Sequence, residues 1–415
     1  MADARSSRDS LSCAAPLRAR ATKNRAQHAT PREVDLLRAT AHTFQATSRP
    51  QDSPLPAVAS PRRKNSFDIV RFVAAALVLV SHSFALTGHV QPMVGNVTVG
   101  TLAVWIFFIM SGFLIAQSWI QYPRFMVFMI KRALRIFPAL IVVLVLSIVC
   151  LGALSTLPYF TYLKTPGTLQ YLNNVLLVNT TYELPGVFSE TIYPNAVNGS
   201  LWTLAYEFTM YLSIAYLGVL SLLRKWSAFG IWIGLLALNL MQLFAPSEKL
   251  FHFSLFYLDA KWMAQLALMF YTGVVMYVFA RQIPFKAGFW APALGLFAVG
   301  AHFFPSYTAV LGGVLLGYGV LGFCHLRAFS GFGRFGDFSY GVYIYAFVVQ
   351  QVVAELTRTH SPLEMFALAF PATVLLGALS WHLVEKRCLR LKKTVQNSDY
   401  PLSARHLARI RSFRT

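Results

Sequence analysis

The chain has 415 residues, of which 56% are hydrophobic and only 13% are charged. A soluble domain carries about a quarter charged residues, so this composition excludes an ordinary soluble protein and indicates one surrounded mostly by lipid. Most of the formal net charge of +20 lies at the ends: residues 1–66 carry 12 Lys/Arg and 5 Asp/Glu, and residues 386–415 carry 9 and 1. Such basic tails are typical of membrane topology signals, and no nucleic-acid-binding motif accompanies them, so we expect a lipid bilayer and no nucleic acid as partner.

Along the chain, an Arg/Ala/Ser/Pro-rich stretch precedes a series of apolar segments. Residues 1–66 contain no apolar run, which predicts a disordered, basic cytoplasmic extension. About ten apolar segments of transmembrane length follow it. They are Phe67–Leu86, Gly100–Trp119, Leu134–Leu154, Leu201–Leu223, Ala228–Phe244, Asp259–Ala280, Ala287–Phe303, Tyr307–His325, Phe338–Leu356 and Met365–Val384. Residues 67–387 are therefore the predicted membrane domain, and residues 388–415 a basic cytoplasmic tail.

The lysines and arginines between these segments predict the orientation of the chain. If the N-terminus is cytoplasmic, most of these cations lie in inner segments, at Arg124, Lys131, Arg132, Arg135, Arg224, Lys225, Arg281, Lys286, Arg327 and Arg334. The outer segments carry few, namely Lys164, Lys249 and Arg358, with Lys261 just inside a helix. The positive-inside rule then predicts an all-α, polytopic membrane bundle of about ten helices with both termini cytoplasmic. The outer segment 155–200 is long enough to fold over an outer opening.

Ionisable residues within membrane helices are functional candidates because their burial must be compensated. Arg71 and His82 are eleven residues apart in the first segment, so they share one helical face, about 16 Å apart along the axis. Glu207 in the fourth segment lies at a depth similar to that of His82, and we expect these two side chains to hydrogen-bond. The alternative is structural: Arg71 extends to the lipid interface and His82 bonds a neighbouring helix.

The third and fourth segments carry further polar and aromatic candidates. Lys131, Arg132 and Arg135 cluster at an inner helix end, a pattern that suits phosphate groups and equally suits lipid headgroups. Trp202 and Tyr211 lie on the same general side of their helix as Glu207, where packing or interfacial anchoring is the simpler explanation.

Two other apolar segments contain small or polar residues. In the second, Ser111 and Gly112 stand where a neighbouring backbone can approach closely. In the ninth, Asp337 precedes Ser339 and Tyr340 and is interpreted as a helix N-terminal partner. The sequence shows no cluster with metal-ligand spacing, so we expect no metal and no bound cofactor.

Several fragments, taken in order, resemble the acyltransferase-3 family of membrane O-acyltransferases. They are FDIVRFVAAALVLVSH, FFIMSGFLI, KRALRIFP, NGSLWTLAYEFTMY, GDFSYGVYIYAF and WHLVEKR, spread over residues 67–387. The resemblance implies a single-domain, multi-pass enzyme of the bacterial cytoplasmic membrane. It implies transfer of an acyl group, most often acetyl, from cytoplasmic acyl-CoA to a hydroxyl of a cell-surface carbohydrate such as exopolysaccharide, lipopolysaccharide or lipo-oligosaccharide.

The resemblance also implies roles for individual residues. His82 corresponds to the family's catalytic histidine, Arg71 to its companion on the same helix, and Glu207 to the family's acidic position. Arg132 and Arg135, with Lys131 beside them, correspond to donor-binding residues. We expect acceptor-side or structural roles for Ser111, Trp202, Tyr211 and Tyr340. Many members have a second histidine in the ninth helix, where this chain has Ala346, so that role does not transfer.

These observations lead to a mechanism in which His82 removes a proton from the acceptor hydroxyl as it attacks the thioester. Direct transfer and an acyl-enzyme relay both fit the sequence. A transporter or flippase of a glycan or acyl donor is the main alternative, since it too would carry charges within the membrane. The sequence does not specify the acyl group, the acceptor sugar or the oligomeric state.

Overall fold

The computed structural model describes residues 66–244, 254–255, 258–334 and 336–397. The expected N-terminal extension, apart from Ser66, and the end of the basic tail lie outside these residues. The described part is mostly helical, as expected. Its helices are α3 (Phe67–Leu86), α4 (Val99–Gln121), α5 (Phe125–Leu151), α6 (Tyr159–Lys164), α7 (Pro166–Gln170), α8 (Trp202–Val219), α9 (Lys225–Phe244), α11 (Ala260–Val278), α12 (Ala287–Phe303), α13 (Thr308–Leu311), α14 (Gly317–Cys324), α15 (Ser339–Thr357), α16 (Pro362–Ser380) and α17 (Lys386–Asn397).

Short elements connect these helices. Two small antiparallel hairpins pair β1 (Met93–Val94) with β2 (Val97–Thr98), and β3 (Ser254–Leu255) with β4 (Leu258–Asp259). Wider π-helical turns join helices at η4 (Gly312–Leu316) and η6 (Trp381–Glu385). The 3₁₀ turns are η1 (Gly152–Leu154), η2 (Tyr171–Leu176), η3 (Pro305–Tyr307) and η5 (Phe332–Arg334).

Within the described residues, 6 helical segments are long and apolar enough to cross a membrane. They are Phe67–Leu86, Val99–Gln121, Phe125–Leu154, Lys225–Phe244, Pro305–Cys324 and Pro362–Lys392. The other four expected spans also form helices. Helix α12 is apolar but shorter, and α8, α11 and α15 are not among the six segments that are long and apolar enough. Helices α8 and α15 carry polar side chains that contact other helices and lower the hydropathy of these segments: Glu207 contacts Ser111 of α4, and Gln350 contacts Leu79 of α3. The number ten and the cytoplasmic termini stay predictions.

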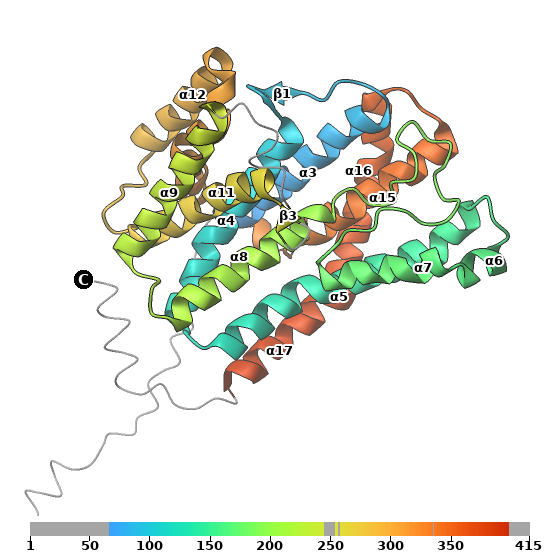
Figure 1. Cartoon of the computed structure of the whole chain (residues 1–415), viewed down its shortest axis with the longest axis horizontal. Helices are drawn as coiled ribbons and strands as arrows, with labels where there is room; N and C mark the ends of the chain where they lie inside the picture. Colours follow the sequence, from blue (N-terminus) through green and yellow to red (C-terminus); the bar gives the residue numbers. More distant parts are fainter. Residues whose placement is uncertain (1–65, 245–253, 256–257, 335, 398–415) are drawn as a thin grey trace, which may run out of the picture. The chain divides into compact units, whose positions relative to one another are not determined.

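Helix α4 lies at the centre of the bundle, packed between α3 and α11 (Figure 1). Its contact with α11 is so close that glycines are required on both helices. A Cβ atom added to Gly112 would overlap the carbonyl oxygen of Phe270, and one added to Gly273 would overlap that of Ile109. The expected close approach of a neighbouring backbone at Ser111 and Gly112 is therefore confirmed.

Replacing Gly112 by Ala is expected to destabilise the protein by about 1–3 kcal/mol, because the added methyl group forces two helix backbones apart. Gly234→Ala in α9 is a matched control, since a Cβ there meets nothing within 4 Å. The free energy of unfolding, measured by chemical denaturation in detergent micelles, should fall for Gly112→Ala only. Equal losses in both variants would contradict the close contact.

The long segment between α5 and α8 folds back over the ends of the neighbouring helices. Its Tyr162 and Tyr171 are fully buried, and the Tyr162 hydroxyl donates to the Ile148 carbonyl at 3.1 Å. At its end, the buried Asn198 side chain donates to the Ile344 carbonyl of α15 at 2.8 Å and accepts from the Ser200 amide. These bonds fix the start of α8 against α15 and so position the residues that follow.

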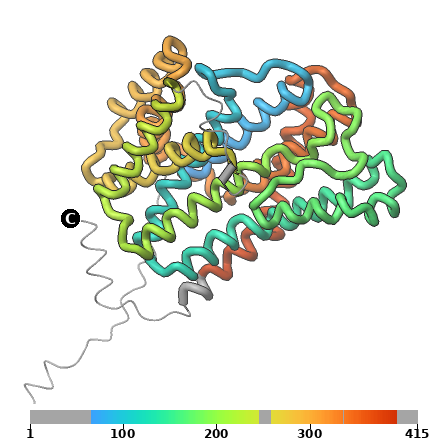
Figure 2. The backbone as a smooth tube through the Cα atoms, viewed as in Figure 1, coloured from blue at the N-terminus to red at the C-terminus, as the bar shows by residue number. Residues whose placement is uncertain are grey.

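The helical path does not end where the tail was expected to begin. The π-helical turn η6 joins α16 to α17, which continues past Arg387 to Asn397. Helix α17 packs along α5, and the two segments lie side by side although they are more than 200 residues apart (Figure 2). This placement brings α17 to the part of α5 that carries Arg132 and Arg135.

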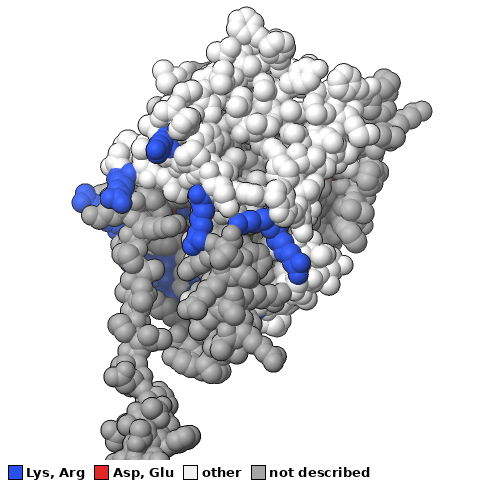
Figure 3. Space-filling view, turned by 90° about the vertical axis from the view of Figure 1, so that its left-hand side faces the viewer, with Lys and Arg blue, Asp and Glu red and all other residues white. Residues whose placement is uncertain are grey.

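The surface charge is unevenly distributed. The face in Figure 3 shows Lys and Arg side chains in one band below a large uncharged area. An uncharged surface of this kind suits hydrocarbon, and a band of cations suits a headgroup region.

Candidate active site

A cavity of about 270 Å³ lies between α3, α4, α5, α8, α15 and α17. We call it the arginine cavity, because Arg71, Arg132 and Arg135 all line it. Its other polar lining residues are Ser111, Thr203, Glu207, Tyr211, Asp337, Ser339, Tyr340, Tyr343 and Lys392. The three arginines that the sequence singled out on two different helices are thus brought into one site.

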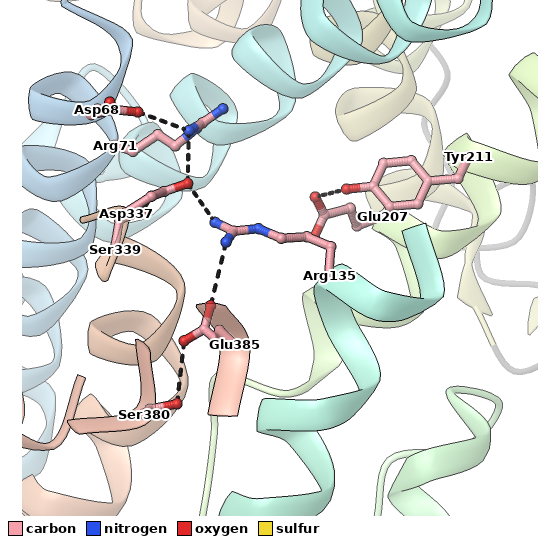
Figure 4. A network of polar contacts seen from close by, with 9 residues as sticks. All are labelled: Asp68, Arg71, Arg135, Glu207, Tyr211, Asp337, Ser339, Ser380 and Glu385. Atoms are coloured by element: carbon pink, nitrogen blue, oxygen red, sulfur yellow. Dashed lines mark hydrogen bonds and ion pairs between the residues drawn. The ribbon is translucent and has the colours of Figure 1, made fainter. Parts of the chain in front are cut away.

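Two of these arginines are held in an ion-pair network centred on Asp337 (Figure 4). The Asp337 Oδ2 atom lies 3.0 Å from Arg71 Nη1 and 2.8 Å from Arg135 Nη2. Its Oδ1 atom accepts from the Ser339 hydroxyl at 2.7 Å. Burial by itself raises the pKa of Asp337, but the guanidinium groups of Arg135 and Arg71 outweigh burial and lower the pKa to about 2. Asp337 is therefore an ion-pair partner of two arginines, where the sequence had suggested a helix N-terminal partner.

The network extends to carboxylates on either side. Arg71 Nη1 lies 3.3 Å from Asp68 Oδ1, one helical turn earlier in α3. Arg135 Nη1 lies 3.3 Å from Glu385 Oε2 in η6, and the Ser380 hydroxyl donates to the other Glu385 oxygen at 3.2 Å. These contacts tie α3, α5, α15 and η6 together and compensate the charges of both guanidinium groups.

Arg132 is held differently. Its Nη2 atom donates to the Ser118 hydroxyl at 3.3 Å, and its guanidinium lies 5.6 Å from the Phe128 ring centre and 5.9 Å from that of Tyr211. Its Nε atom is buried without a hydrogen-bond partner. Lys131, expected beside it, does not line the arginine cavity: its ammonium group lies 4.5 Å above the Tyr122 ring. Neighbouring positions on a helix point in different directions, which separates the two side chains.

Glu207 also lines the arginine cavity, and the expected hydrogen bond from Glu207 to His82 is not formed. The Tyr211 hydroxyl donates to Glu207 Oε1, and the Ser111 hydroxyl approaches the same atom at 3.5 Å. The Tyr340 hydroxyl donates to the Ile136 carbonyl at 2.9 Å. Ser111, Tyr211 and Tyr340, expected near the acceptor or in structural roles, therefore all lie on the arginine side.

His82 lines a second, larger cavity of about 800 Å³, which we call the histidine cavity. The His82 ring packs edge-on against Phe347, with ring centres 5.1 Å apart, and its Nδ1 atom is buried without a hydrogen-bond partner. Trp202 lines this cavity too, with its ring centre 5.1 Å from that of Trp262. Polar side chains from several segments complete the wall, namely Gln91, Thr98, Thr101, Asn179, Thr180, Glu183, Asn195, Ser200 and Asp259. The long segment after α5 thus contributes to the wall of this cavity, and its place on the outer side stays a prediction.

The two cavities meet at Val104 and Tyr343, which line both. Tyr343 is fixed through its hydroxyl, which lies 2.6 Å from the Thr203 hydroxyl and donates to the Ser200 carbonyl at 3.1 Å. Its ring packs edge-on against Phe107, with centres 5.7 Å apart. Arg71 and His82, on one helix, therefore face separate cavities that share Val104 and Tyr343 in their walls.

Sequence reasoning missed two residues of this site. Asp337 was given a local role, and Lys392 was placed in the tail, yet both line the arginine cavity. A signal for Lys392 was present: Trp381, Glu385, Leu389 and Lys392 follow at intervals of four, four and three, which places them on one helical face. No comparable local pattern marks Asp337, since its partners are distant in the sequence.

Comparison with known sequences identifies the family. Its profile, described as an acyltransferase domain, matches residues 64–382. The chain belongs to the acyltransferase-3 family. It is similar to the "O-acetyl transferase" of Shigella phage Sf6, with 33% identity over 79% of this chain and 96% of the relative. It also resembles "Nodulation protein 10" of Rhizobium leguminosarum bv. viciae, with 27% identity over 80% and 95%.

A third relative is "Exopolysaccharide production protein ExoZ" of Rhizobium meliloti, with 28% identity over 75% of this chain and 95% of the relative. No solved structure matches the chain. Family membership makes the protein an enzyme that transfers acyl groups, and its apolar helices make it a membrane protein. The comparisons thus favour an acyl-transferring enzyme over a transporter or flippase.

Proposed function

We propose that this acyltransferase-3 protein is a bacterial cytoplasmic-membrane enzyme that transfers an acyl group, most often acetyl, from cytoplasmic acyl-CoA to a hydroxyl of a cell-surface carbohydrate. The observation that carries the proposal is the pair of cavities that meet at Val104 and Tyr343. One is lined by cations and the other by His82 with aromatic and polar side chains. The names of relatives, an O-acetyl transferase and an exopolysaccharide production protein, support the acceptor class.

The arginine cavity is the proposed donor side. Phosphate groups form strong charge-assisted hydrogen bonds with cationic side chains, and the thin pantetheine arm of acyl-CoA suits a narrow space. The positive-inside prediction places this end in the cytoplasm, where acyl-CoA is made. The thioester would then approach His82 past Tyr343 while the phosphates stay behind.

The histidine cavity is the proposed acceptor side. Aromatic faces such as those of Trp202 and Trp262 suit the apolar faces of sugar rings, and the surrounding amides, hydroxyls and carboxylates suit sugar hydroxyls. As general base, His82 takes the proton of the acceptor hydroxyl while that oxygen bonds to the thioester carbonyl carbon. The carbon–sulfur bond then breaks, the thiolate takes up a proton, and an ester and free CoA are the products.

The proposal is tested with the full chain reconstituted in proteoliposomes. With acetyl-CoA added on one face and a bacterial surface polysaccharide on the other, wild type should release free thiol and form an O-acetyl ester only when both are present. Thiol release without an acceptor ester would contradict the carbohydrate assignment. Ester formation only when donor and acceptor share one face would contradict transfer between the two cavities.

A further inference from the structure

The four cations of the arginine cavity differ in how their charges are compensated. Arg71 and Arg135 are engaged by three carboxylates, those of Asp68, Asp337 and Glu385. The three carboxylate charges outnumber the two guanidinium charges, so this network has no excess positive charge. Arg71 and Arg135 are therefore structural cations, and an incoming anion would have to compete with carboxylates already in place.

Arg132 has no direct ion pair, and Glu207 compensates its charge only from a distance. Within the described part of the chain it forms no ion pair with a carboxylate, and its hydrogen-bond partner is the neutral Ser118. Glu207, the other carboxylate of the cavity, is bonded to Tyr211 and Ser111 instead. The buried, unpartnered Nε atom of Arg132 is a donor that requires an acceptor from elsewhere, because an unsatisfied buried donor of a charged group is costly.

Lys392 is the second cation without a direct ion pair, and Asp337 acts on it only from a distance. It lies on α17, is partly buried, lines the arginine cavity, and forms no ion pair or hydrogen bond with any described residue. The packing of α17 along α5 holds it there, with Leu389, one turn earlier, lining the same cavity. Two cations thus face one small cavity without a direct ion pair to any described carboxylate, and an incoming phosphate group can bind both.

We propose that Lys392 and Arg132 form the anion-binding pair that holds the phosphate groups of the acyl donor. The inference rests on the proposed acyl-CoA donor and reassigns phosphate binding from Arg135 to a lysine that lies beyond the matched family region 64–382. Guanidinium and ammonium groups are the common partners of phosphate oxygens. The cavity, at about 270 Å³, is just below the usual range of roughly 300–1,000 Å³ for ligand pockets. It suits a diphosphate and a thin arm, with the nucleoside outside.

The test compares Lys392→Gln, Lys392→Arg and Lys386→Gln in the full chain in nanodiscs. Lys386 is the control because it is an exposed lysine of α17 that does not line the cavity. Two donors are used, acetyl-CoA and S-acetylpantetheine, which lacks the diphosphate. Lys392→Gln should raise the KM for acetyl-CoA about tenfold to a hundredfold, the loss expected for one charge-assisted hydrogen bond. The KM for S-acetylpantetheine should not change, and Lys392→Arg should stay close to wild type.

A KM for acetyl-CoA that rises no more in Lys392→Gln than in Lys386→Gln would overturn the inference and leave the donor assignment intact. Equal losses with both donors would also overturn it, since they would indicate a structural role. If wild type uses no acyl-CoA at all, direct binding of inorganic pyrophosphate tests whether Lys392 and Arg132 bind anions. If pyrophosphate binding is weakened in Lys392→Gln and retained in Lys392→Arg, the anion-binding pair stands and only the proposed acyl-CoA donor is wrong. If pyrophosphate does not bind, or binds equally well in Lys392→Gln, both the anion-binding pair and the acyl-CoA donor are wrong.

Discussion

Replacing His82 by Ala is expected to lower kcat for acyl transfer about a hundredfold to ten-thousandfold, the range that a general base contributes. The physical reason is that a hydroxyl is a weak nucleophile unless its proton is removed as it attacks. His82 is the histidine that lines the proposed acceptor cavity, and its Nδ1 atom has no hydrogen-bond partner among the described residues. Ester formation on a supplied polysaccharide and release of free thiol are the two measurements.

His89→Ala is the matched control, because His89 is exposed and lies just beyond the end of α3, outside the lining of the histidine cavity. It should retain wild-type kcat. The Kd for acetyl-CoA should be unchanged in both variants, since His82 lines a different cavity from the arginines. Wild-type turnover in His82→Ala would exclude the general-base role, and weakened donor binding in that variant would indicate disturbed packing instead.

Replacing Asp337 by Ala is expected to destabilise the protein by about 3 kcal/mol, the low end of the range for a broken buried ion pair. The substitution removes the carboxylate that Arg71 and Arg135 share, at 3.0 and 2.8 Å from their nitrogen atoms, and leaves each guanidinium group with one carboxylate at 3.3 Å. The low end applies because the side chains are about one-fifth exposed, at 22%, 20% and 21% for Arg71, Arg135 and Asp337.

Glu190→Ala provides the control for the Asp337 prediction. Its ion pair with Arg358 has nearly the same length, 3.2 Å, but both side chains are exposed, at 69% and 74%. Water screens such a pair, so the loss should stay below about 1 kcal/mol. Free energies of unfolding come from chemical denaturation in detergent micelles. Similar losses for the two variants would show that the Asp337 network does not stabilise the fold.

The helices and the identity of several site residues followed from the sequence by itself. Hydropathy over segments of membrane length depends on composition alone, so it located α3, α4, α5 and others without knowledge of their neighbours. Arg71, His82, Arg132 and Glu207 were recognisable because ionisable groups in apolar segments are rare, whatever surrounds them. The glycine at position 112 likewise carried a local signal for close helix packing, which the structure confirms.

Only the tertiary structure decided which of these residues meet. Depth along a helix suggested that Glu207 faces His82, yet Glu207 is bonded to Ser111 of α4 and to Tyr211 of its own helix and lines the other cavity. A helix position fixes depth to within a turn, but the side to which a side chain points depends on how neighbouring helices pack. Asp337 acquired its role through Arg71 and Arg135, which are 266 and 202 positions away in the sequence. The local spacing placed Lys392 on one helical face, but only the packing of α17 on α5 decided that this face meets the cavity.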